Sequence, residues 1–394
     1  MLMELLLSLI LVIIGTKLAG HLCHRIGIPA VIGELLTGVV LGPALLGLVL
    51  HTEMISIFAE IGVILLMFLA GLESDLDKLK KYLKPSVMVA LFGILLPMIF
   101  LSGAAHLFDI TWKEAIFIGV IFSATSVSIS VQVLKEYKRL DTAEGSVTLG
   151  AAVVDDIAVV LIVSLFSAFL NMDSGSSSVG GIGLLWDLLG TKILFFLGLF
   201  LFAKFILKPL INLTKKLVAV EIETALGLVL CFAFAIIAQK VGMSDVIGAF
   251  FIGLLLSKHE VKHNIEHNTS VIGYSLFIPV FFVSIGLDIE LSAFKEYAVL
   301  IIVFTVLATL TKLIGGYLGG RLTHLDRDQS LIVGAGMVSR GEMALIIVKM
   351  GENLGLVSAG HYSAIVVAVI LTTLFSPLLI KFAIERAEKK NTLA

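Results

Sequence analysis

Two aspartates stand side by side within an apolar run in the segment GAAVVDDIAVVLIVSLF, residues 150–166. A charged side chain at the centre of a membrane helix costs about 2.5–3.5 kcal/mol on insertion scales, so a functional or paired role is expected for Asp155 and Asp156. Carboxylate oxygens are hard ligands that suit Na⁺ and Li⁺. Burial also raises carboxylate pKa values and lowers that of lysine. The pair therefore predicts a site that exchanges a cation for protons near neutral pH.

Further charges fall inside apolar runs, among them Lys312, Arg340 and Glu342. Successive helical residues point about 100° apart, so the two aspartates cannot face one partner. One of them can pair with Lys312 while the other faces a cavity. A structural ion pair is the simpler interpretation for Arg340 and Glu342, one of which would neutralise a helix end. It fits the aspartates poorly, because two acids and one lysine leave an excess negative charge.

Hydroxyl side chains precede the aspartates at Thr125, Ser126 and Ser128. They could complete a cation shell beside unwound backbone carbonyls. Serine and threonine also bond harmlessly to their own helix in membrane proteins, which is the competing interpretation.

Histidines recur every four residues in the stretch SKHEVKHNIEHNTS, at His259, His263 and His267. That spacing would place them on one helical face as metal ligands or a pH sensor. A solvated loop is the commoner case. Acids near predicted helix ends or in glycine-rich stretches are interpreted as structural or gating groups (Glu34, Glu73) and as caps or interfacial charges (Asp245, Asp288).

The composition requires a membrane protein. Of 394 residues 58% are hydrophobic and only 15% charged, with a mean hydropathy of +1.08. A soluble chain would carry roughly 25% charged residues. The formal net charge of −2 and the absence of a dense basic stretch give no indication of nucleic-acid binding. The first segment lacks a positive n-region and a cleavage site, so it is expected to be a retained span.

Apolar runs of about 20 residues predict thirteen membrane helices. Lysine and arginine mark the cytoplasmic side. With the N-terminus outside and the C-terminus cytoplasmic, 19 basic residues fall in inner loops and five in outer ones. This predicts a multi-pass protein of the cell membrane. The approximate spans are 2–21, 29–50, 57–73, 86–108, 115–134, 146–171, 183–206, 222–240, 245–257 (short for a full crossing), 270–288, 296–320, 330–350 and 361–384.

An internal repeat runs through the chain at one constant shift, which places Gly27 on Gly242 and is called the repeat offset below. GIPAVIGELLTGVVLG from Gly27 resembles GMSDVIGAFFIGLLLS from Gly242, and GLESDL from Gly71 resembles GLDIEL from Gly286. The repeat offset places the first six helices on the last six and leaves the seventh as a connector. The second copy thus begins seven membrane crossings after the first. Because seven is an odd number, the second copy would be inverted in the membrane. The offset also pairs residues 123–126 with 338–341, polar patches that predict two broken helices lining a cavity.

These motifs together resemble the bacterial cation/proton antiporters of the NapA type, and also the membrane part of the glutathione-gated potassium efflux proteins. The resemblance covers essentially the whole chain. The segments that carry it are IGIPAVIGELLTGVVLGP, FLAGLESDL, FSATSVS, AAVVDDIAVV, the lone Lys312 and VSRGEMAL. It implies that Asp156 binds the ion and the proton and that Asp155 pairs with Lys312. It also implies that Thr125 and Ser126 lie in a crossed-helix break.

The resemblance further implies an all-α polytopic fold of the NhaA/NapA kind and a homodimer in which a core domain moves like an elevator. Helices 1–3 (1–73) and 8–10 (222–288) would form the dimerisation scaffold. Helix 7 (183–206) would be the linker. Helices 4–6 (86–171) and 11–13 (296–384) would form the core.

The expected function is therefore electrogenic Na⁺(Li⁺)/H⁺ antiport serving pH homeostasis, with no cofactor and no enzymatic activity. Its partners would be membrane lipids and small monovalent cations. K⁺/H⁺ antiport or K⁺ efflux is the main alternative. The chain ends about ten residues past the last span, whereas the potassium efflux relatives carry a large C-terminal nucleotide-binding domain, so Na⁺ is preferred. A passive cation channel is a weaker alternative. An intramembrane aspartyl protease is disfavoured, because adjacent acids on one helix point apart.

Overall fold

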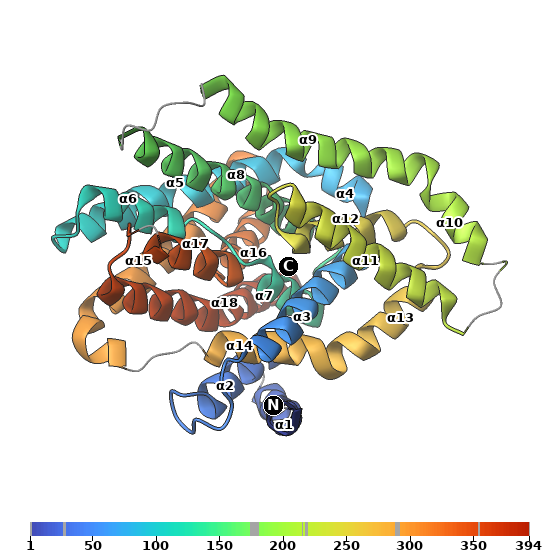
Figure 1. Cartoon of the computed structure of the whole chain (residues 1–394), viewed down its shortest axis with the longest axis horizontal. Coiled ribbons are helices and arrows are strands. Elements are labelled where there is room, and N and C mark those ends of the chain that lie inside the picture. The colour runs from blue at the N-terminus through green and yellow to red at the C-terminus, as the bar shows by residue number, and fades with distance from the viewer. Residues whose placement is uncertain are drawn as a thin grey trace. The chain divides into compact units, whose positions relative to one another are not determined.

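The computed structural model describes residues 2–26, 29–173, 181–214, 216, 220–287, 292–353 and 355–393. Within these ranges every regular element is a helix (Figure 1), as the composition predicted. The helices are α1 (Leu2–Arg25), α2 (Ala30–Leu41), α3 (Glu53–Glu73), α4 (Leu76–Lys81), α5 (Leu83–Leu107), α6 (Trp112–Ile121), α7 (Val127–Glu136), α8 (Ala143–Asp173), α9 (Gly181–Phe205), α10 (Leu207–Thr214), α11 (Ile222–Lys240), α12 (Asp245–Leu256), α13 (Lys262–Ile272), the π-helix η1 (Gly273–Phe277), α14 (Ile278–Leu287), α15 (Ser292–Leu322), α16 (Arg327–Gly336), α17 (Glu342–Asn353) and α18 (Ala359–Leu393).

Seven helical segments of the described chain are long and apolar enough to cross a membrane. An eighth crossing results if residues 190–205 and 207–214, which meet at a 47° bend, are taken together. The other predicted spans correspond to α8, to the short α2 and α12 and to the two interrupted helices α6–α7 and α16–α17. A total of thirteen crossings therefore stays a prediction.

Two predicted boundaries are wrong. The span expected at 29–50 ends as a helix at Leu41, and the amides of Leu48 and Val49 return to the Leu41 carbonyl. Proline at position 43 has no amide to continue the helix. The span expected at 270–288 begins as a helix at Lys262 and continues through the π-helix to Leu287.

The chain divides into two compact units. The first comprises residues 1–59, 77–159 and 279–394, and contains all the residues predicted to bind or couple ions. In this unit α15 packs along α5, α16 and α18. A Cβ at Gly315 or Gly319 would collide with the backbone of Phe92 or Val89 on α5. Small residues at such positions let membrane helices approach closely, because packing rather than burial from water drives their association.

The second unit comprises residues 60–76 and 160–278. Here α11 packs on α12 and on α13. Close backbone contact again depends on glycine, because a Cβ at Gly253 would collide with the backbone of Phe68 and Leu72 on α3.

Helix bounds recur at the repeat offset. The offset carries both ends of α2 onto the ends of α12, and both ends of α6 onto those of α16. Two glycine contacts recur in the same way. Gly33 faces the backbone of Ala19, and the offset carries this pair onto Gly248 and Phe234. It likewise carries Gly119 and Met98 onto Gly334 and Leu313. The similarity of the two copies therefore extends from residue types to packing contacts.

We expect Gly38→Ala and Gly253→Ala to destabilise the protein by similar amounts. An added Cβ would collide with the backbone of Val283 and Gly286 at the first position and of Phe68 at the second. Such overpacking costs about 1–3 kcal/mol. Thermal unfolding in detergent measures the loss. Gly103→Ala is the matched control, because open space surrounds that position on α5. A melting midpoint of Gly38→Ala equal to that of Gly103→Ala would contradict the close approach.

Candidate ion-binding site

The helix predicted at 115–134 is broken in its middle. α6 ends at Ile121, and the amides of Phe122, Ser123 and Ala124 still bond back to α6. The backbone then runs without helical bonding through Thr125 and Ser126, and α7 begins at Val127. Ser126 has extended dihedral angles. All five residues of the break are buried. Serine and threonine side chains compete with the helix for backbone bonds, which favours a break in the sequence FSATSVS.

A second break lies between α16 and α17, at residues 337–341, and the two breaks bond to each other. The Ser126 amide donates to the Ser339 carbonyl at 2.8 Å, and the Ser339 hydroxyl donates to the Ser126 carbonyl at 2.5 Å. The Ser130 hydroxyl lies 2.9 Å from that of Ser339 and also donates to the Gly336 carbonyl. Backbone groups that leave helical bonding in this apolar interior therefore find partners in the opposite break.

Arg340 supplies most of the remaining donors. Its side chain is completely buried. The guanidinium donates to the carbonyls of Phe122 at 2.8 and 3.0 Å, Val338 at 3.1 Å and Ala308 at 2.9 Å, and it lies over the Phe122 ring. Phe122 and Val338 follow the C-terminal ends of α6 and α16, where the helix dipoles are negative. A fixed cation is favourable there, as expected for a structural charge at a broken helix.

Asp155 and Lys312 form a direct ion pair, and Thr125 hydrogen-bonds to both. Both charged side chains are 0% exposed, and the Lys312 ammonium lies 3.1 Å from Asp155 Oδ2. The ammonium also donates to the Thr125 hydroxyl at 2.6 Å, and that hydroxyl donates to Asp155 Oδ2. Asp155 Oδ1 is buried and has no hydrogen-bond partner among the described residues. One oxygen of this carboxylate is thus saturated and the other is available.

Asp156 lies one residue further along α8, about 100° around the helix, and is 8% exposed. It interacts electrostatically with Lys312, while Arg340 interacts with Asp155. The two acids and two bases therefore form one cluster. Arg340 belongs to the same cluster, so among the described residues its positive charge offsets the excess negative charge inferred from the sequence.

The other predicted residues stand apart or cannot be placed. The Ser126 and Ser128 hydroxyls lie 3.5 Å from each other beside the first break. The side chain of Glu342, at the start of α17, and all of Asp288 lie outside the described residues. Glu34 lies on α2, and Glu73 ends α3. The Asp245 carboxylate accepts from the Val246 amide at 2.9 Å in the first turn of α12, whose N-cap is Ser244.

The histidines are not in one loop. His263 and His267 lie exposed on α13, and only His259 lies in the preceding turn. No group of three possible metal-ligating residues occurs in the described chain, so a metal site at these histidines finds no support. Burial, with Lys208 nearby, lowers the pKa of His259. The His259 side chain is therefore neutral at neutral pH.

Several site residues were not singled out from the sequence. Ser130 and Ser339 join the breaks, and the Thr373 hydroxyl donates to the Arg340 carbonyl. A Cβ at Gly93 would lie 3.6 Å from the Lys312 ammonium, so a glycine on α5 leaves room for the lysine head. Single serines and glycines are common in membrane helices, and no spacing distinguishes these from the rest.

Comparison with known proteins relates this arrangement to one family. A family model described as "Sodium/hydrogen exchanger, transmembrane" matches residues 7–385. A Na⁺/H⁺ antiporter of Enterococcus hirae is 48% identical over 96% of this chain and 98% of its own length. The Na⁺/H⁺-K⁺ antiporter GerN of Bacillus cereus is 39% identical over 98% of both chains.

The fold also resembles a solved structure. The sodium proton antiporter MjNhaP1 of Methanocaldococcus jannaschii superposes with a TM-score of 0.65, covering 99% of this chain and 98% of that one at 17% sequence identity. This likeness establishes the fold.

We expect Arg340→Met to destabilise the protein strongly, because the carbonyls of Phe122 and Val338 lose the donors of the guanidinium and that of Ala308, inside α15, loses one of its donors. Each buried carbonyl left without a partner costs about 1–3 kcal/mol. Arg340→Lys should recover only part of the loss, since one ammonium cannot reproduce the planar fork. Thermal unfolding in detergent measures both. The matched control is Arg25→Met, at an exposed position at the end of α1. Equal midpoints for Arg340→Met and Arg25→Met would contradict the anchoring role.

Proposed function

Because the chain belongs to the sodium/hydrogen exchanger family, we propose that it is a secondary Na⁺(Li⁺)/H⁺ antiporter of the cell membrane. The observation that carries the proposal is the buried Asp155–Lys312 pair, with Asp156 beside it, where two broken helices meet. Intramembrane charges in transporters mark ion pathways. The named activities of the Enterococcus hirae and Bacillus cereus relatives support the same assignment.

In this mechanism Asp156 is the exchange site. Protonated Asp156 releases its proton on one side of the membrane and then binds Na⁺, whose preference for oxygen ligands suits a carboxylate. Asp155 Oδ1, which has no hydrogen-bond partner among the described residues, would offer the cation a second carboxylate oxygen. Thr125 and Ser126 would add oxygens from the first break. Thr125 is bonded to Lys312 in this structure, so its participation requires that the lysine move away.

Lys312 acts as the coupling group. Without Na⁺ its ammonium neutralises Asp155, and cation binding releases it. A lysine freed from its counter-ion in a buried site loses its proton readily. A proton from Lys312, added to the proton from Asp156, makes the exchange electrogenic, with more protons than Na⁺ ions moved in each cycle.

The repeat supplies the means of alternating access. The recurrence of helix bounds and glycine contacts at the repeat offset supports two copies of one six-helix unit, inverted in the membrane, with the site where the copies meet. We propose N-terminus outside and C-terminus cytoplasmic, as the basic loops predict. The core helices of residues 86–171 and 296–384 would move as an elevator against a homodimeric scaffold of residues 1–73 and 222–288.

K⁺ is the second candidate cation. The printed name of GerN includes K⁺ as well as Na⁺, and this relative covers almost the whole chain. A site built from carboxylate and hydroxyl oxygens does not by itself exclude the larger cation.

We expect Asp156→Asn to abolish cation-dependent proton movement, because an amide neither releases a proton nor carries the negative charge that holds Na⁺. Purified protein in liposomes with an imposed pH gradient, challenged in turn with Na⁺, Li⁺ and K⁺, gives the measurement. Asp109→Asn is the control, since this exposed aspartate lies in the turn before α6 at a positive φ, which asparagine accepts. Collapse of the gradient by Asp156→Asn on Na⁺ addition would refute the assignment. In the wild-type protein, the cation that collapses the gradient identifies the substrate.

We expect the wild-type transport rate to change with membrane potential. The double variant Lys312→Gln with Asp155→Asn should lose this response and exchange Na⁺ more weakly, for one proton at Asp156, because asparagine offers the cation only an uncharged oxygen. The pair is replaced together because Lys312→Gln alone would leave Asp155 buried without its counter-ion, which costs about 3–5 kcal/mol. Proteoliposomes clamped at different potentials with K⁺ and valinomycin provide the test. A wild-type rate independent of potential would contradict electrogenic coupling by Lys312.

A further inference from the structure

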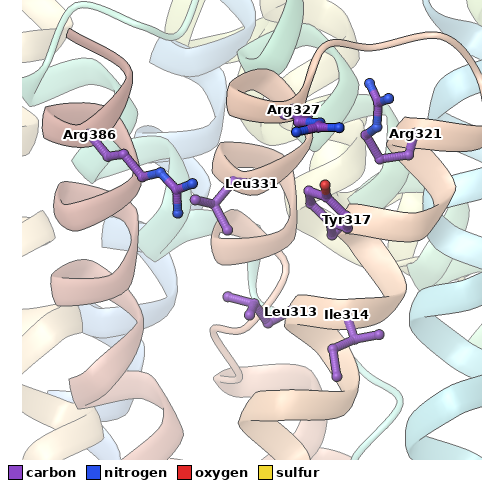
Figure 2. Close-up of a pocket in the computed structure, with 7 residues that line it drawn as sticks. All are labelled: Leu313, Ile314, Tyr317, Arg321, Arg327, Leu331 and Arg386. Carbon is purple, nitrogen blue, oxygen red and sulfur yellow. The ribbon is translucent and has the colours of Figure 1, made fainter. Parts of the chain in front are cut away.

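A pocket of about 640 Å³ lies in the first unit, away from the aspartates, between α15, α16 and α18 (Figure 2). Arg321 and Arg327 lie at one end, Leu313 and Ile314 lie at the other, and Arg386 lies beside Leu331. Figure 2 shows the Tyr317 hydroxyl pointing from α15 toward the end where Arg327 lies, and Leu313 and Ile314 further along the same helix. The lining residues are Leu313, Ile314, Tyr317, Arg321, Arg327, Leu331 and Arg386.

The polar end carries uncompensated positive charge. Arg321 donates to the Leu325 carbonyl at 2.6 Å, which fixes the side chain without neutralising it. Arg327 and Arg386 have no acidic partner within 4 Å among the described residues. Three acids nearby in the sequence are paired with other cations: Asp328 with Lys390 at 2.9 Å, Glu385 with Lys381 at 3.5 Å and Glu388 with Arg139 at 3.0 Å. A fourth acid, Asp326, caps α16 by accepting from the Gln329 amide at 2.7 Å.

The apolar end continues onto an exposed hydrophobic stripe. Ile314 is 43% exposed, and Leu310 and Leu318, one helical turn away on either side, are 46% and 38% exposed. Residues four apart on a helix lie on one face. On a membrane helix such an exposed aliphatic face suits acyl chains, so the pocket joins an anion-binding end to a hydrocarbon-binding end.

We propose that this pocket binds an anionic phospholipid, with its phosphodiester among Arg321, Arg327 and Arg386 and an acyl chain along Leu313, Ile314 and Leu331. Arginine matches phosphate oxygens with a planar fork of donors. Basic pockets between membrane helices on the cytoplasmic side bind anionic lipid headgroups. Inorganic phosphate shares the oxyanion chemistry but leaves the aliphatic end unused, and the lipid satisfies both. None of the ion-site residues takes part, so the lipid site is independent of the transport assignment.

The test compares thermal unfolding in phosphatidylcholine micelles with and without phosphatidylglycerol. Wild-type protein and the control Arg25→Gln should show a stabilising shift on addition of phosphatidylglycerol, and the double variant Arg327→Gln with Arg386→Gln should lose it. Native mass spectrometry should show phosphatidylglycerol occupancy falling roughly fivefold for each arginine removed. Arg25 is also an exposed arginine, on α1 rather than at the pocket, so the control removes the same charge from elsewhere.

Two results would overturn the proposal. One is a phosphatidylglycerol shift in the double variant as large as in wild type. The other is an equal, arginine-dependent shift produced by millimolar inorganic phosphate without anionic lipid, which would make the occupant a free anion. If the double variant does not fold, Leu331→Phe replaces it. This change fills the aliphatic end without altering charge. It should remove the phosphatidylglycerol shift and leave unfolding in phosphatidylcholine unchanged, and a retained shift would reject the lipid.

Discussion

The need to satisfy backbone groups released inside an apolar interior governs the rest of this structure. Two helices stop and restart at residues 122–126 and 337–341, where no water is expected to serve as a partner. The breaks persist because they bond to each other through Ser126 and Ser339 and because Arg340 donates to carbonyls from both. The ionic chemistry follows from this arrangement. Thr125 can reach Asp155 and Lys312 because its backbone has left the helix.

The charges at the crossing are balanced as a group. Asp155 and Lys312 neutralise each other directly, while Arg340 is held by carbonyls and also interacts electrostatically with Asp155. A positive charge that is fixed and one that can change partner have different uses. The first bonds to the broken backbone, and in the proposed mechanism the second leaves Asp155 able to take Na⁺ in place of the ammonium. Loss of either base would therefore have different consequences, one for the fold and one for coupling.

Much of the fold and the choice of site residues could be predicted from the sequence, because both leave periodic or chemically rare signals. Apolar runs indicated the helical class, the repeat offset located both breaks, and Asp155 with Lys312 were conspicuous as charges in hydrocarbon. Local changes in backbone conformation, such as the points where helices begin and end, were not predicted. The early end of α2 at Leu41 and the helix that places His263 and His267 on α13 depend on local turns within runs of uniform composition. A structural role for Arg340 at a broken helix was expected, but its partners could not be predicted, because they are backbone carbonyls, which every residue carries and no sequence pattern marks. Ser130 and Ser339 were missed for the same reason.

Thr125 and Arg340 occupy equivalent positions in the two copies, because the repeat offset carries one onto the other. The residues equivalent to Asp155 and Asp156 are Ile370 and Leu371, and Ile370 is buried. A duplicated scaffold would by itself provide two identical sites. In this chain one copy has acids and a hydroxyl, and the other has an arginine and hydrocarbon. This difference between the two copies leaves one acidic site per chain instead of two. In the proposed mechanism each chain would therefore carry a single cation at a time, while Arg340 in the second copy bonds to the backbone of the break in the first.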